Sequence, residues 1–139
     1  MSGPLAATSA PSAPRLVACG KSASLYPEVF NSASLGGFFA AELKKAGYDG
    51  IVIRGKSSRP VYLSINNEKV EINDAGHLWG LTNSKTRQQV REEVGEKVRL
   101  LTIGPGAENG SRIGTIATDA GGSGSRGFGS MMEIGRAHV

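Results

Sequence analysis

The chain has 139 residues, enough for one domain, and 20 of them are glycine. Its formal net charge is +4, and no run of Lys and Arg reaches the roughly five residues of a nucleic-acid patch. This mild positive charge favours a small anion over nucleic acid as a ligand. No apolar run approaches the ~18 residues of a membrane span. The single cysteine, Cys19, excludes an internal disulfide and any multi-cysteine metal cluster held by this chain alone.

The predicted elements begin after a Pro-, Ala- and Ser-rich stretch over residues 1–14, which we expect to form a loop. The apolar run Arg15–Lys21 is typical of a short strand, whereas Ser22–Ser34 is predicted to be irregular. Gly36–Ala46 is predicted to be a helix, because its apolar residues recur at helical spacing and Gly47 offers a C-terminal stop.

A buried strand and a hairpin are predicted next. Tyr48–Gly55 contains three consecutive β-branched residues, which is typical of a buried strand. Pro60–Ile65 and Glu68–Ile72 alternate apolar and polar residues with period two and therefore indicate a hairpin. The intervening Asn66-Asn67 pair suits its turn, because asparagine tolerates a positive φ.

The second half of the chain is predicted to hold one further helix, two strands and a glycine-rich loop. Asn83 or Ser84 can cap a mostly polar, surface helix that runs to Val94. Val98–Ile103 and Arg112–Thr118 are typical of strands, and the stretch AGGSGSRGFGS that follows is predicted to be a loop. Because strands and helices do not alternate regularly, the sequence favours an α+β fold with a mixed or largely antiparallel sheet.

Two parts of the chain repeat one order of features: a Gly-Pro pair, an arginine before an aliphatic residue, and a Ser/Gly-rich bend. The copies comprise Gly3-Pro4, Arg15-Leu16 and residues 34–38, then Gly104-Pro105, Arg112-Ile113 and residues 125–129. Either chance in a glycine-rich chain or a duplicated unit with a pseudo-twofold axis would produce this order. In the second case, two glycine bends with free N–H groups would face each other and suit a ligand with two phosphate-like ends.

A second interpretation rests on Gly122–Gly127, which match the pattern G-x-G-x-x-G of nucleotide- and phosphate-binding loops. A glycine-rich stretch produces this match easily, so the pattern alone is weak. Four basic residues flank Gly/Ser-rich turns, where each is either solvated or able to clamp a phosphate: Arg15, Lys21, Arg112 and Arg126.

The remaining reactive side chains are assigned structural roles. Cys19 is expected to fill a core strand and His77 to pack within a loop, whereas Asp49, Asp74 and Asp119 are expected to cap turns. No nucleophile–base pair and no suitably spaced carboxylates indicate acid–base chemistry, so no catalytic residue is predicted.

Several longer stretches carry a resemblance to a known family: GPLAATSAPSAPR from Gly3, SLGGFFAAELKKAGYDGIVIRGKSSRPVYLSI, INDAGHLWG, IGPGAEN, and SRGFGSMM up to Met132. In order and spacing they resemble the N-terminal domain of the aldehyde:ferredoxin oxidoreductases, which are tungsten- or molybdenum-dependent bis-pterin enzymes. The resemblance covers nearly the whole chain and is far more specific than the glycine pattern.

This resemblance implies an α+β domain of two intertwined β-rich repeats with short helices, whose sheets form the base for two pterins. It implies a parent enzyme that oxidises aldehydes to carboxylic acids, with tungstopterin or molybdopterin, magnesium, and a [4Fe-4S] cluster that passes electrons to ferredoxin. On the same basis we expect a cytoplasmic protein that binds neither nucleic acid nor membrane and that can form a homodimer.

The family's cofactor-binding positions carry over to residues of the two bends: Arg15, Ser34, Gly36, Gly37, Gly122, Ser123, Gly124, Ser125 and Arg126. By this resemblance Arg15 contacts a pterin, and the backbone of Gly36 approaches the cofactor. Main-chain carbonyl groups of Ser34 and Ser123 would ligate the magnesium ion that bridges the two cofactor phosphates.

The chain also departs from the family pattern. Gly122 stands where the family has an arginine, and Arg126 keeps a later arginine that can take over the phosphate contact. The cluster cysteines have no counterpart, and EIGRAHV follows Met132 where the family has GSKNLKAI. We therefore expect a pterin-base domain over residues 1–132, a non-native tail of adapter origin over 133–139, and a gene fragment that is inactive alone.

Overall fold

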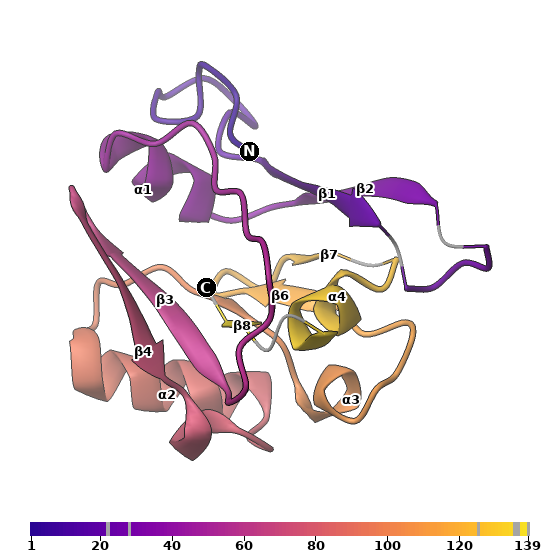
Figure 1. The fold of residues 1–139 in the computed structure, drawn as a ribbon. Helices are drawn as coiled ribbons and strands as arrows, with labels where there is room; N and C mark the ends of the chain where they lie inside the picture. Colours follow the sequence, from indigo (N-terminus) through magenta and orange to yellow (C-terminus); the bar gives the residue numbers. More distant parts are fainter. Residues whose placement is uncertain (22, 28, 125, 135–136, 139) are drawn as a thin grey trace.

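Short strands and short helices make up the computed structural model, which describes residues 1–21, 23–27, 29–124, 126–134 and 137–138 (Figure 1). In chain order the elements are β1 (Leu16–Lys21), β2 (Phe30–Leu35), α1 (Phe39–Lys45), β3 (Val61–Asn66), β4 (Lys69–Asp74), η1 (Gly76–Leu78), α2 (Asn83–Val94), β5 (Leu101–Thr102), α3 (Pro105–Glu108), β6 (Ile116–Thr118), β7 (Ser123–Gly124), α4 (Phe128–Ile134) and β8 (Ala137–His138). The fold is the predicted α+β class. No helix in the described part of the chain is both long and apolar enough to cross a bilayer.

The strands form three small sheets, in the orders β1-β2, β4-β3-β8 and β5-β6-β7. The pairs β1–β2, β3–β4, β5–β6 and β6–β7 are antiparallel, whereas β8 pairs with β3 in parallel. The second strands of two pairs, β2 and β7, lie against each other, so that β1–β2 and β6–β7 meet side by side (Figure 1).

The repeat expected from the sequence is present as two hairpins, each followed by a glycine bend and a short helix, α1 or α4. The Gly-Pro pairs also form matching turns. The N–H of Ala6 donates to the Gly3 carbonyl at 3.1 Å, and the N–H of Ala107 donates to the Gly104 carbonyl at 2.9 Å. Both alanines are buried in the same core, so the two copies contribute equivalent residues to one hydrophobic cluster.

Two hydrophobic clusters hold these elements together. The larger one joins both hairpins to α1 and α4, and Leu35, Ile103 and Phe128 are almost wholly buried within it. The smaller one packs Leu78 and Val90 between η1, α2 and the segment that precedes β5. Burial of apolar side chains is the main source of stability, so the joint between the hairpins lies over the best-packed part of the molecule.

The prediction that residues 22–34 are irregular was wrong for residues 30–34, which form all of β2 except its last residue. This strand pairs with β1 in a continuous register from Leu16↔Leu35 to Lys21↔Phe30. Its sequence, FNSASL, has low strand propensity, so pairing with β1 rather than local preference stabilises the strand.

The prediction of a buried strand over Tyr48–Gly55 was also wrong. These residues form no strand, and the side chains of Val52 and Ile53 are 80% and 51% exposed. β-branched residues favour a strand only where a neighbouring strand accepts the ladder. In this chain the segment lines an apolar cavity of about 460 Å³, together with Met131 and Met132 of α4.

Several elements begin or end at other residues than predicted, because turns and caps set their ends. The β3–β4 register pairs Asn66 with Lys69, so the turn residues are Asn67 and Glu68, and Asn67 has the positive φ (52°). The strands predicted over 98–103 and 112–118 shorten to β5 and β6, and α3 was not predicted. The prediction of a foreign tail over 133–139 stays a prediction.

The N-cap of α2 is Thr82 rather than Asn83 or Ser84, because its hydroxyl oxygen accepts a hydrogen bond from the Lys85 N–H at 3.4 Å. Thr82→Ala is expected to lower the free energy of unfolding by about 1 kcal/mol, since a helix N–H loses its acceptor. Urea denaturation measures this change, with Ser84→Ala as the matched control. An equal loss in both variants would contradict the assignment of the cap.

Candidate functional site

Four glycines lie where β2 and β7 meet, and we call Gly36, Gly37, Gly122 and Gly124 the glycine seam. A methyl group added at Gly122 would lie 2.8 Å from the Gly36 carbonyl oxygen and 3.1 Å from its carbonyl carbon. One added at Gly37 would lie 2.9 Å from the Thr118 hydroxyl, and one at Gly124 would lie 3.0 Å from Cγ of Leu35. The seam therefore brings together two bends that lie about 85 positions apart in sequence, and their backbones lie too close for a side chain at Gly122.

The second bend is closed by hydrogen bonds within the turn from β6 to β7. The N–H and hydroxyl of Thr118 both donate to the Gly122 carbonyl, at 2.8 and 3.2 Å, and the N–H of Gly121 donates to the Thr118 carbonyl at 3.2 Å. Gly121 has a φ of 81°, which favours glycine. These bonds hold Gly122 against Gly36.

One side of the seam is open. No atom outside the neighbouring residues lies within 4 Å of the position that a Cβ would take at Gly36. Ser34 and Ser123 are exposed on the two meeting strands. Nε of Arg15 donates to the Ser34 hydroxyl at 3.0 Å, which holds a guanidinium group at this edge. Main-chain groups, hydroxyls and a cation together suit a ligand with anionic oxygens.

The other predicted arginines are held by a side-chain amide of β2 and by backbone carbonyls of the segment that links β1 and β2. Nη1 of Arg126 donates to Oδ1 of Asn31 at 2.8 Å, and Arg126 has a φ of 65°. Arg112 donates to the carbonyl oxygens of Ala23 at 2.7 Å and Leu25 at 3.2 Å. Arg112 thus fastens this linking segment to the second repeat. Ser125, also a predicted site residue, lies outside the described residues.

Two structural assignments made from the sequence need correction. Cys19 is exposed rather than in the core, because alternation along β1 turns Leu16 and Gly20 toward the interior instead. The side chain of Asp119 is only 1% exposed and pairs with arginines, so it is more than a turn cap. Asp74 does cap a turn, since its Oδ1 accepts from the Gly76 N–H at 2.9 Å.

The nucleotide-binding interpretation of Gly122–Gly127 is not favoured by the topology. That interpretation needs a parallel strand–helix–strand unit with the glycines at its first turn. Here the pattern begins before β7 and includes that strand, and β7 pairs antiparallel with β6. Within the described residues, β3–β8 is the only parallel pair.

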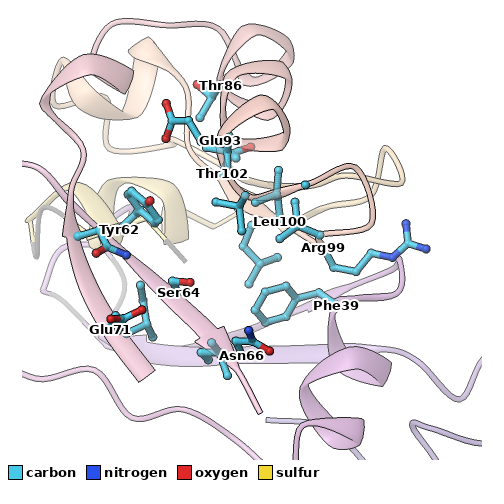
Figure 2. Close-up of a pocket in the computed structure, with 18 of the residues that line it drawn as sticks. Phe39, Tyr62, Ser64, Asn66, Glu71, Thr86, Glu93, Arg99, Leu100 and Thr102 are labelled. Carbon is cyan, nitrogen blue, oxygen red and sulfur yellow. The ribbon is translucent and has the colours of Figure 1, made fainter. Parts of the chain in front are cut away.

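A larger cavity, of about 650 Å³, lies between the β3–β4 hairpin, α2 and β5 (Figure 2). Several charged side chains at its edge are already paired: Glu93 lies 2.9 Å from Nε2 of His77, and Glu71 lies 2.9 Å from Nζ of Lys69. Among the residues that the structure describes, no group of three or more His, Cys, Asp or Glu could hold a metal ion. The glycine seam is therefore the stronger candidate site.

The chain is similar to known proteins in sequence and in fold. Residues 1–135 match the family model described as aldehyde ferredoxin oxidoreductase, N-terminal domain. The chain is 46% identical over 118 residues to the tungsten-containing aldehyde ferredoxin oxidoreductase of Pyrococcus furiosus, and 42% identical over 120 residues to that of Thermococcus kodakarensis. Each alignment covers 84% of this chain and 19% of the relative, so the chain spans about a fifth of their length.

A solved structure has the same fold. The active-site complex BamBC of benzoyl coenzyme A reductase, in complex with 1,5-dienoyl-CoA, is 34% identical and superposes with a TM-score of 0.90. The match covers 99% of this chain and 21% of that chain. The chain therefore belongs to the aldehyde ferredoxin oxidoreductase family, whose N-terminal domain of two intertwined β-rich repeats it reproduces.

Proposed function

We propose that the glycine seam forms the base of the bis-pterin site in a tungsten-dependent enzyme that oxidises aldehydes to carboxylic acids, with ferredoxin as electron acceptor. The observation that carries this proposal is the close approach of Gly122 to the Gly36 carbonyl, which sets the turn from β6 to β7 beside the bend after β2, with one open face. Support also comes from the relatives, which are named as tungsten-containing and as ferredoxin oxidoreductases.

The residues at the seam fit such a group. The open space at Gly36 lets a flat ligand approach the backbone, and Arg15 offers a planar cation for a pterin or its phosphate. In this proposal the main-chain carbonyls of Ser34 and Ser123 ligate magnesium, and Gly37 and Gly124 border the cradle. The cofactor contacts expected of Ser125 and Arg126 stay predictions. The tungsten–pterin group, when bound, supplies the metal that accepts an electron pair from the aldehyde.

Other parts of the reaction need residues from elsewhere in a longer protein. One cysteine cannot supply the four thiolates that a [4Fe-4S] cluster requires. The proposed role of this chain is to bind and orient the cofactor, and alone it is expected to be inactive. A cytoplasmic location, which accords with ferredoxin as acceptor, and a homodimer are further parts of this proposal.

Gly36→Ala tests the site without disturbing the fold. In a chimera where this chain replaces the matching segment of the Pyrococcus furiosus enzyme, the new methyl group would fill the cofactor's space. We expect bound tungsten and pterin to fall about tenfold, equivalent to ~1.4 kcal/mol of lost binding. Stability is expected to change by less than about 0.5 kcal/mol, because nothing non-neighbouring lies within 4 Å.

The control is Gly106→Ala, which adds the same methyl group at another glycine with open space around it. Metal analysis and pterin fluorescence after denaturation measure both chimeras. Retention of tungsten and pterin in Gly36→Ala at the level of Gly106→Ala would contradict the proposed site.

A further inference from the structure

One side chain contacts a residue beside each half of the glycine seam. Nη1 of Arg99, which precedes β5, lies 3.0 Å from Oδ2 of Asp119 in the second bend. The same guanidinium lies over the ring of Phe38, with its carbon 5.2 Å from the ring centre, and Phe38 directly follows Gly37 in the first bend. In Figure 2 the Arg99 guanidinium points away from the cavity that this residue helps to line.

The Asp119 end of this link is firmly fixed. Its carboxylate is buried, and Nη2 of Arg91 in α2 lies 3.5 Å from the same Oδ2. Arg87, also in α2, donates to the carbonyl oxygens of Thr118 and Asp119 at 3.1 and 3.4 Å. The N–H of Asp119 donates to the Leu100 carbonyl at 3.2 Å. Removing one partner of a buried charge is strongly unfavourable, so Asp119 holds Arg99 in place.

The Phe38 end is half-exposed and depends on the shape of the guanidinium. The Phe38 side chain is 51% exposed, and a planar cation stacks on such a ring while its edge donates to a carboxylate. A lysine ammonium carries the same charge but is a point donor without a flat face. Arginine can therefore make both contacts at once, whereas lysine can make only one well.

We propose that Arg99 is a positioning residue that holds the two halves of the glycine seam at a fixed separation. It acts through Asp119 on the bend that carries Gly122, and through Phe38 on the bend that carries Gly36. The consequence for ligand binding rests on the proposed bis-pterin function, since a ligand with two phosphates would meet a preorganised cradle. The link between the bends can be measured without any ligand.

Hydrogen exchange followed by mass spectrometry tests the link in the full chain. Arg99→Lys is expected to speed amide exchange about threefold in peptides covering both 34–39 and 117–124, because both bends lose a common tether. Peptides from the β3–β4 hairpin are expected to exchange at the original rate. The control is Arg59→Ala, which removes an exposed ion pair with Asp74 (3.5 Å) and should change neither peptide. Faster exchange in one bend only, or in neither, would overturn the proposal.

A second variant distinguishes loss of the link from a general loss of stability. Phe38→Leu leaves the buried Asp119 pair intact and removes only the ring. If Arg99 couples the bends, this change also speeds exchange in 117–124, which lies on the far side of the link. Unchanged exchange there would refute the coupling even if 34–39 loosened.

Cofactor content then separates this proposal from the proposed function. In the chimera, Arg99→Lys is expected to lower tungsten and pterin content about threefold, less than Gly36→Ala, because the binding groups remain. Unaltered exchange in Arg99→Lys overturns the positioning role, whatever Gly36→Ala does. Faster exchange in both bends, with full cofactor content in both Arg99→Lys and Gly36→Ala, supports the link and contradicts the bis-pterin site.

Discussion

Gly122→Ala is expected to lower the free energy of unfolding by about 2 kcal/mol, within the range for overpacked sites. The added methyl group would meet the Gly36 carbonyl at 2.8 Å and the Thr118 hydroxyl at 2.9 Å. The Gly36 contact is to backbone and cannot be relieved by rotating a side chain, so the two hairpins must separate. Urea denaturation of this chain measures the loss, and tungsten content measures its effect on the chimera.

Gly36→Ala is the matched control for this experiment, because the same methyl group there meets no non-neighbouring atom within 4 Å. The two variants are expected to separate stability from binding. Gly122→Ala should reduce both, whereas Gly36→Ala should reduce cofactor content alone. Equal stability in the two variants would show that the hairpins do not touch at this point.

Phe128→Ala is expected to lower the free energy of unfolding by about 3–5 kcal/mol, through lost burial and the cavity left behind. Phe128 is the first residue of α4 and is 1% exposed, in the cluster that contains Leu35, Ile103 and Ile116. It joins the second repeat to the first. Because small domains have roughly 5–15 kcal/mol of stability in total, much of the native population should be lost.

The control for that prediction is Phe30→Ala in β2, since the Phe30 side chain is 76% exposed. Thermal and urea denaturation followed by circular dichroism should show a change below about 0.5 kcal/mol for Phe30→Ala. A similar loss in both variants would mean that the core does not lie between β2 and α4.

Local patterns predicted the elements that carry their own signal. Period-two alternation located β3 and β4, helical spacing located α1, and capping residues located α2, each to within a few residues. β2 was missed because its serines and alanines have no strand preference of their own, and its existence depends on pairing with β1. The error over Tyr48–Gly55 has the opposite cause, since strand-forming residues there have no partner strand in the described structure.

The candidate site was likewise predicted only in part. The repeated Gly-Pro, arginine and Ser/Gly-rich features located the first bend at residues 34–38, but their second copy, 125–129, follows β7. The turn from β6 to β7 was indicated by the glycine pattern and by the family resemblance, which named Gly122 and Ser123. The link through Arg99 was not predicted, because Phe38, Arg99 and Asp119 are far apart in sequence and only Phe38 lies in one of the recurring features. The only local signal was an aspartate directly after a strand, which a turn cap explains equally well.

Contact between main chains across the glycine seam constrains how the two halves of the domain can evolve. At Gly122 the opposing atoms belong to the peptide group of Gly36, which every amino acid has in common. No substitution at Gly36 removes that carbonyl group, so we infer that position 122 must stay glycine while the surrounding surfaces specialise.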